Sequence, residues 1–211
     1  MGLLCVPYIN MDETTEPTML SALLDQPAKQ ALLHTPWPEY PYKPAVQFVL
    51  AYSGDSFLLK FFVAEKQIRS VATQINGPVW EDSCVEFFVA FDETGYYNFE
   101  FNCMGTPLCG FGKERNNRRL LPEERLRQIE TVSLIQRSGD GACHWELTVR
   151  IPFAVCIHHQ LSSLHGKTAK ANFYKCGDAL PEPHFVSWQP IHSPTPNFHL
   201  PQFFGELIFE K

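Results

Sequence analysis

The chain has 211 residues, of which 45% are hydrophobic and 13% aromatic, and its net charge is −6. The apolar content is sufficient for a packed core and excludes a disordered chain. The negative charge argues against nucleic acid or an anionic membrane as the main partner, because both attract proteins that carry a positive field.

The seven cysteines are scattered, odd in number and form no CxxC pair, which favours reduced thiols over a disulfide framework. The first ten residues lack the basic and apolar regions of a signal peptide. No later stretch approaches the roughly 18 apolar residues of a membrane helix. These features predict a cytoplasmic protein, although a secreted or periplasmic form without its signal peptide would have the same features.

Residues 1–40 predict an irregular lead-in with short helical turns. Residues 18–34 have a helical composition that is interrupted by Pro27, and we expect this proline to open a second turn. The prolines on both sides of Trp37 favour an extended segment that cannot be a central strand.

From residue 45 onward the sequence predicts strands. Ser53-Gly54-Asp55 separates two apolar runs as a hairpin turn would. Residues 103–128 predict a loop with one short helical turn, and the six prolines of residues 181–201 predict a long ordered loop over a sheet face or edge. We therefore predict an all-β protein: a single β-sandwich domain over residues 1–211, with two mostly antiparallel sheets, about 8–10 strands and one or two short helices.

Residues 79–91 predict a strand whose two faces differ. Side chains alternate with a period of two, so one face is apolar and the other carries polar groups. The apolar face holds Val85, Phe87, Val89 and Phe91, and the other holds Asp82, Cys84, Glu86 and Phe88, with Trp80 just before the strand.

Residues 96–102 alternate even more sharply and predict the next strand of a hairpin. Tyr97 opposite Phe91 would set Glu86 opposite Asn102. The neighbouring register, with Glu86 opposite Glu100, is less favourable because it opposes two like charges. Either register gathers a polar patch on one sheet face: Asp82, Glu86, Asn98, Glu100 and Asn102.

Five segments together resemble the carbohydrate-binding module family 9-like proteins over roughly residues 40–210. They are residues 80–88, 97–102, 172–178, 184–188 and 203–205. The Asp-Ser-x-Val-Glu core of the first segment is similar to a wider group of sandwich domains, which includes haem- and sugar-binding DOMON-type modules.

The resemblance implies a β-sandwich that holds a terminal sugar residue between two aromatic rings, while a glutamate and a basic residue bond its hydroxyls. Trp80 and Glu86 match that spacing, and the resemblance suggests Trp188 as the second aromatic and Arg115 as the basic residue. It implies a saccharide partner, no catalytic residue and no cofactor, although structural calcium is possible because some members bind it. The candidate carbohydrate-binding residues are Trp80, Asp82, Glu86, Asn98, Glu100, Asn102, Arg115, Asn172 and Trp188.

Structural roles remain open for these residues: the carboxylates can pair within the protein, the tryptophans can belong to the core, and the basic run 113–119 can be a solvated loop. Two other functions also remain open. Glu86 and Glu100 on neighbouring strands could form the carboxylate pair of a glycosidase. Met104 or a histidine could ligate haem in a DOMON-type module.

Overall fold

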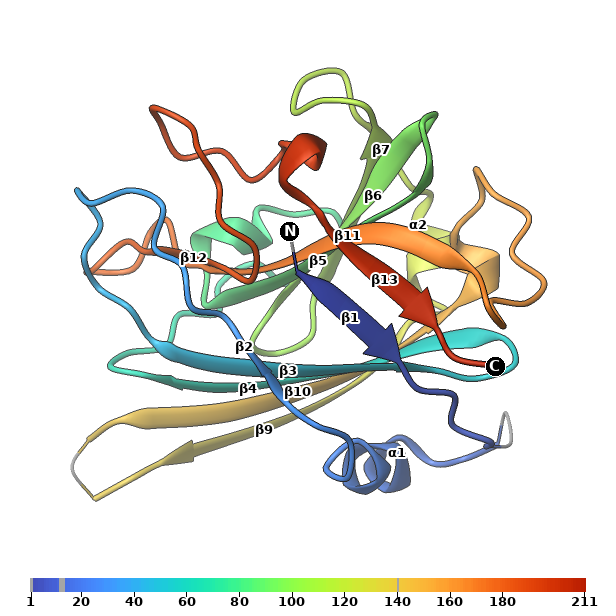
Figure 1. Ribbon diagram of the computed structural model, residues 1–211. Coiled ribbons are helices and arrows are strands. Elements are labelled where there is room, and N and C mark those ends of the chain that lie inside the picture. The colour runs from blue at the N-terminus through green and yellow to red at the C-terminus, as the bar shows by residue number, and fades with distance from the viewer. Residues whose placement is uncertain (1, 12–13, 140) are drawn as a thin grey trace.

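The computed structural model describes all residues except 1, 12–13 and 140, and it shows two β-sheets packed face to face (Figure 1). The strand order is β1-β13-β11-β5-β6-β7-β8 in the first sheet, where β12 also pairs with β11, and β2-β3-β4-β10-β9 in the second. Strands β1 and β13 are parallel, whereas the other strand pairs of the described residues are antiparallel.

The first sheet contains β1 (Leu3–Val6), β5 (Cys84–Asp92), β6 (Gly95–Asn102), β7 (Pro107–Gly112), β8 (Arg119–Leu120), β11 (Thr168–Cys176), β12 (Phe185–Ser187) and β13 (Gly205–Phe209). The second contains β2 (Gln30–Ala31), β3 (Ala45–Tyr52), β4 (Ser56–Glu65), β9 (Glu130–Arg137) and β10 (Cys143–Pro152). The helices are α1 (Pro17–Leu23) and α2 (Glu123–Leu126), and the 3-10 turns are η1 (Val79–Glu81), η2 (Phe153–Val155) and η3 (Pro201–Phe203).

The predicted, mostly antiparallel β-sandwich is confirmed, but the described residues form thirteen strands rather than about 8–10. The predicted loop over residues 103–128 is wrong where β7 and β8 form, although its short helical turn is present as α2. Other additional strands are short, and β2 and β8 have two residues each. So few residues show no alternation that distinguishes them from a loop. No helix of the described residues is long and apolar enough to span a membrane.

The core between the sheets follows the predicted alternation. Most inward-facing side chains of β5 and β10 are buried. The ring of Phe48 on β3 stacks across the gap on that of Phe173 on β11, with centroids 3.7 Å apart, and Phe173 also stacks on Phe87 of the neighbouring strand β5, with centroids 5.0 Å apart. Full burial of each such side chain contributes roughly 1.5–3 kcal/mol relative to exposure. This apolar packing is the main source of stability.

The lead-in differs from the prediction in two places. The second helical turn after Pro27 is wrong, because Gln30–Ala31 form strand β2 beside β3. Residues 3–6, expected to be irregular, form β1, which lies at the sheet edge beside β13, at the other end of the chain (Figure 1). A pairing of such long range leaves no signal in the local sequence pattern.

The Pro-rich segment of residues 181–201 crosses the outer face of the first sheet, as predicted. The rings of Tyr174 and Phe198 stack with centroids 4.1 Å apart, and the Tyr174 hydroxyl donates a hydrogen bond to the Phe198 carbonyl at 3.1 Å. The prediction of a loop throughout is wrong for Phe185–Ser187, which form β12 between two prolines. The segment encloses a sheet face that would otherwise be exposed to water.

The register of the β5–β6 hairpin differs from the favoured prediction, because Glu86 lies opposite Glu100 and Val89 opposite Tyr97. A bulge between Val89 and Asp92 absorbs one residue and shifts the pairing. The prediction assumed that both glutamates are ionised. Burial raises the pKa of both carboxyl groups, which removes the like-charge repulsion on which the prediction rested.

A buried ionic cluster joins the two sheets to the Pro-rich segment. The Lys175 ammonium on β11 lies 3.0 Å from Glu65 Oε2 at the end of β4, and the side chains of both residues are fully buried. Glu65 Oε1 accepts a hydrogen bond from the Trp145 indole at 2.7 Å, and Lys175 Nζ donates to His184 Nε2 at 2.7 Å. His184 therefore carries its proton on Nδ1, where it donates to the Glu182 carbonyl at 2.9 Å.

Candidate functional site

Trp80 is the exposed aromatic at one end of the first sheet. It lies in the 3-10 turn η1, just before β5, and is 39% exposed, whereas the other three tryptophans are at most 9% exposed. Its carbonyl accepts a hydrogen bond from the Asp178 N–H at 3.1 Å, and the Glu81 carbonyl accepts one from Ala179 at 3.1 Å. The loop after β11 thus fixes the backbone of an exposed ring.

Two carboxyl groups lie opposite each other on the enclosed face of β5 and β6. Glu86 and Glu100 are 3% and 4% exposed. Burial raises the pKa of Glu86 well above its usual range, and Cys176 and Glu100 act in the same direction. Burial also raises the pKa of Glu100 to about 7, against the opposing effect of the hydrogen bond that Asn98 Nδ2 donates at 2.8 Å.

Arg118 is a residue of this face that the sequence analysis missed. Its side chain crosses β7 and donates to Asn98 Oδ1 at 2.8 Å and to the Tyr96 carbonyl at 2.8 Å, while its guanidinium lies 4.2 Å from the centroid of the Tyr96 ring. A Cβ at Gly110 would lie 3.1 Å from Asn98 Oδ1 and 3.4 Å from Arg118 Nε. Glycines in a strand that directly precedes a basic run are the signal that could have indicated it.

Two arginines of the basic run contact neighbouring parts of the fold, Arg118 on this sheet face and Arg115 on the Pro-rich segment. Arg115 is exposed and donates to the Pro196 carbonyl at 3.4 Å, which holds it against the Pro-rich segment. Exposed Asp178 has a pKa raised to about 6 by partial desolvation, and Arg115 opposes this shift. Arg115 also opposes the rise in the pKa of Glu100, so its charge acts on both carboxyl groups.

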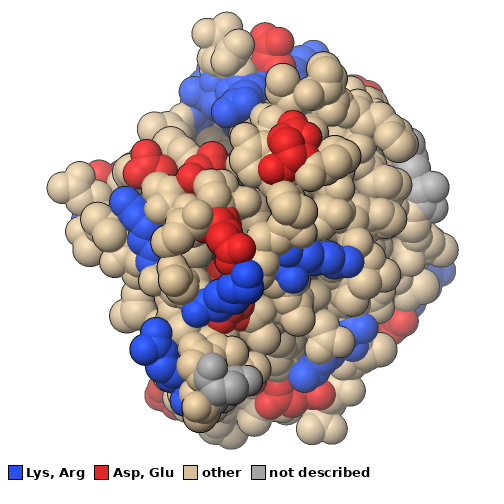
Figure 2. All heavy atoms as spheres, turned by 90° about the vertical axis from the view of Figure 1, so that its left-hand side faces the viewer, with Lys and Arg blue, Asp and Glu red and all other residues tan. Residues whose placement is uncertain are grey.

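Basic and acidic side chains are interspersed at the end of the sandwich where β12 lies (Figure 2). Such a mixed surface offers hydrogen-bonding groups at short range rather than a uniform field over a long one. That pattern suits a neutral polar ligand better than a polyanion.

The side chains of Asp82 and Asn102 are occupied by hydrogen bonds within the protein. Asp82 is fully buried and forms an ion pair with Arg69, and its Oδ2 accepts hydrogen bonds from the Val71 and Ala72 amides, each at 2.9 Å. Asn102 Nδ2 donates to Asp82 Oδ2 at 3.0 Å. Burial alone would raise the pKa of Asp82, but these donors hold it below its usual value. Asp82 and Asn102, which were both predicted to bind the sugar, therefore hold the chain segment before η1 in place.

Replacement of Asp82 by asparagine is expected to lower the free energy of unfolding by about 2–3 kcal/mol, because a neutral amide forfeits the ion pair with Arg69. Urea denaturation measures the loss. The matched replacement Glu93→Gln, at a side chain that is 96% exposed, should change stability by less than about 0.5 kcal/mol. Equal effects of the two substitutions would contradict the structural role of Asp82.

Asn172 and Trp188 also differ from their predicted roles. Asn172 Oδ1 accepts hydrogen bonds from the Phe173 and Gln189 amides, each at 2.9 Å, so this side chain anchors the Pro-rich segment to β11. Trp188 packs edge-on against Phe48 and Phe173 in the core between the sheets. Its ring is therefore not the second half of a clamp around Trp80.

Metal-binding side chains gather at one place in the described part of the chain. The group comprises Cys84, Glu86 and Cys176, whose ligand atoms lie within 4.8 Å of one another. Calcium takes six to eight oxygen ligands, so a donor set with two sulfurs does not fit the structural calcium that the family resemblance implies.

The chain matches carbohydrate-binding family 9 over residues 18–209. It is similar to the crystal structure of a candidate carbohydrate-binding protein from Bacteroides uniformis ATCC 8492, with 41% identity, a TM-score of 0.91 and 99% coverage of both chains. No match was found among curated proteins.

Two more distant structures share the fold. Both are family 9 modules from Caldicellulosiruptor kristjanssonii, one in complex with cellotriose (11% identity, TM-score 0.67, 99% of this chain and 94% of that chain) and one with glucose (12% identity, TM-score 0.63, 99% and 96%). The match over residues 18–209 shows that the chain belongs to carbohydrate-binding family 9.

Proposed function

We propose that this protein binds a saccharide without transforming it, and that the ring of Trp80 is the surface on which the sugar stacks. The observation that carries the proposal is the exposure of Trp80: a 39% exposed indole is held on a hydrogen-bonded turn while the other tryptophans are buried. An exposed aromatic of fixed orientation loses little entropy when an apolar sugar face covers it. The glucose and cellotriose bound by the two distant relatives are suitable probes.

The polar partners of the sugar would come from the rim beside Trp80. Asp178 follows β11 and donates its amide to the Trp80 carbonyl, and exposed Arg115 shares the electrostatic surroundings of Asp178. A carboxylate and a guanidinium give charge-assisted hydrogen bonds to hydroxyl groups. Glu86 and Glu100 are nearly fully enclosed and are not exposed to the sugar, and the negative charge of Asp178 contributes to the raised pKa of both.

The glycosidase alternative receives less support. A retaining glycosidase needs one ionised carboxylate and one protonated acid, so that the pKa values of the two groups are separated. Burial instead raises the pKa of both Glu86 and Glu100. Turnover of an aryl glycoside that disappears in Glu86→Gln would overturn the non-catalytic proposal. Haem ligation by Met104 is also less well supported, because this side chain is 57% exposed in the turn after β6.

Isothermal titration calorimetry with glucose, cellotriose and a panel of other mono- and disaccharides tests the proposal. Stacking with a few hydroxyl contacts typically gives a Kd on the order of micromolar to millimolar. Trp80→Ala should weaken binding at least about tenfold, because it removes the stacking surface. Tyr8→Ala, which removes a 37% exposed aromatic elsewhere, should leave the Kd unchanged. Unaltered affinity in Trp80→Ala would refute the role of this ring.

A further inference from the structure

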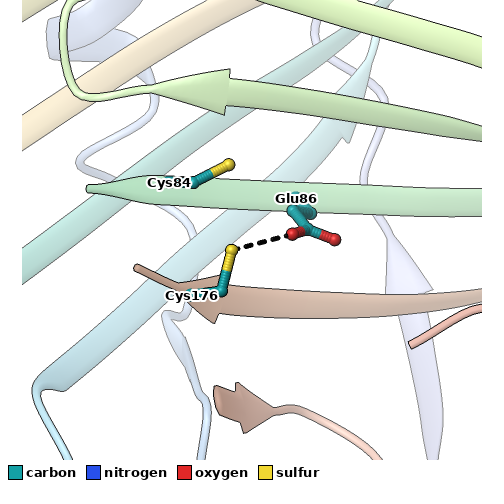
Figure 3. A group of neighbouring side chains, drawn as sticks. All are labelled: Cys84, Glu86 and Cys176. Atoms are coloured by element: carbon teal, nitrogen blue, oxygen red, sulfur yellow. Dashed lines mark hydrogen bonds between the residues drawn. The ribbon is translucent and has the colours of Figure 1, made fainter. Parts of the chain in front are cut away.

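Two thiols and one carboxyl group converge on the enclosed face of the first sheet (Figure 3). Cys84 on β5 and Cys176 on β11 are directly opposite in the antiparallel register. Glu86 lies two residues along β5, on the same face as Cys84. Cys176 Sγ donates to Glu86 Oε1 at 3.1 Å, and the three ligand atoms lie within 4.8 Å of one another.

This cluster is enclosed, and one of its polar atoms is unsatisfied. Cys84, Glu86 and Cys176 are 0%, 3% and 2% exposed. Glu86 Oε2 is buried and has no hydrogen-bond partner among the described residues. A buried acceptor without a partner costs about 1–3 kcal/mol, and native structures seldom leave one without a reason. A cation beside Oε2 would supply the missing interaction.

We propose that Cys84, Glu86 and Cys176 form a binding site for one thiophilic divalent cation, with Zn²⁺ as the best fit. Ligands of tetrahedral Zn²⁺ lie about 2.0–2.3 Å from the ion, so neighbouring ligand atoms are about 3.5 Å apart. The side chains already lie within 4.8 Å and need to contract by about 1 Å. Sulfur donors select Zn²⁺ over Mg²⁺ and Ca²⁺.

The surroundings can complete the coordination. Glu86 Oε2 can provide a second carboxylate contact, or the Trp80 carbonyl, which lies 3.6 Å from Cys176 Sγ, can occupy the fourth position. Binding converts two thiols to thiolates and leaves Glu86 as a carboxylate, so the bound ion replaces the protons that these groups held, and they are released to solvent. The site does not depend on the proposed saccharide function.

Titration of reduced, chelator-stripped protein with Co²⁺ and then Zn²⁺ tests the site, in a Cys5→Ser background that removes the exposed thiol. We expect one equivalent of Co²⁺, a thiolate-to-cobalt charge-transfer band, displacement by Zn²⁺ and a higher Tm with excess Zn²⁺. Cys84→Ser and Cys176→Ser should each weaken binding at least about 100-fold, beyond the 10–100-fold typical of outer-shell changes. Cys143→Ser, at a buried thiol that donates to the Lys66 carbonyl, should not alter it.

Glu86→Gln provides a second test if a cysteine variant fails to fold, since it keeps the shape and both thiols. Its circular dichroism should match that of the parent protein, while its metal affinity falls at least about tenfold. Absence of the charge-transfer band in the parent protein would overturn the proposal, as would its persistence in the Cys84→Ser/Cys176→Ser double variant. A disulfide between Cys84 and Cys176 in protein purified without reductant would also overturn it.

Discussion

Replacement of Glu65 by alanine should lower the free energy of unfolding by about 3–5 kcal/mol, which is the largest effect that we expect from any single substitution. The change leaves the Lys175 ammonium buried without its counter-ion, which lies 3.0 Å away in the native protein. It also removes the acceptor of the buried Trp145 indole. Equilibrium denaturation in guanidinium chloride, compared at pH 7, measures the difference.

Two further variants test whether the loss of stability in Glu65→Ala comes from the buried ion pair rather than from the loss of the side chain. Glu65→Gln keeps an acceptor for Trp145 but loses the charge, so its stability should lie between those of Glu65→Ala and the parent protein. Lys66→Ala breaks the neighbouring ion pair with Glu182, whose side chains are 63% and 50% exposed, and should lower stability far less than Glu65→Ala does, because solvent screens this pair. A loss in Glu65→Ala as small as that in Lys66→Ala would mean that the buried pair contributes nothing beyond a surface pair.

His184 should lower the stability of the protein as the pH falls below about 6.5, whereas the buried carboxyl groups with raised pKa values contribute in the opposite direction. Burial and the neighbouring Lys175 lower the pKa of His184 from 6.5 to about 3, so the folded protein resists protonation. The unfolded chain binds the proton near pH 6.5, so the stabilisation is complete above that pH and is lost as the pH falls toward 3. Between pH 7 and 4.5 the loss is about 2–3 kcal/mol.

His184→Gln isolates this contribution because glutamine does not titrate. Other groups, including Glu86 and Glu100 with their raised pKa values, titrate in both proteins and cancel in the difference. In unfolding curves at half-unit pH steps, the stability of the variant relative to that of the parent protein should increase as the pH falls from 7 to 4.5. Parallel curves over this range would contradict the assignment of a neutral, buried His184.

The sequence predicts the sandwich well where strands are long and central. The alternation of Trp145, Leu147 and Val149 identifies the buried face of β10, because one side of that strand lies against the core. The alternation does not identify β1, β2 and β12, because these short strands are fixed by pairing with distant segments of the chain. The hairpin register was wrong for an electrostatic reason, since the ionisation of Glu86 depends on a covering segment more than ninety residues away in the chain.

The predicted site residues differ in burial, and their spacing in the sequence does not show this. Trp80 and Arg115 lie at the exposed rim, but Asp82 and Trp188 serve the loop network and the core. A residue type and its spacing do not show which hydrogen-bond donors the fold supplies to it. Arg118 was hidden in a basic run, because only the fold shows the side chain crossing β7 beside Gly110.

The central claim is that a saccharide stacks on Trp80, and the indole N–H signals of the four tryptophans in a ¹⁵N–¹H correlation spectrum test it directly. Trp80→Phe assigns the Trp80 signal by its disappearance. Titration with cellotriose should shift the Trp80 signal saturably and leave those of Trp37 and Trp145 in place, because these indoles are buried and donate to the Ser193 carbonyl and to Glu65. Saturable binding that leaves the Trp80 signal unmoved would contradict the claim.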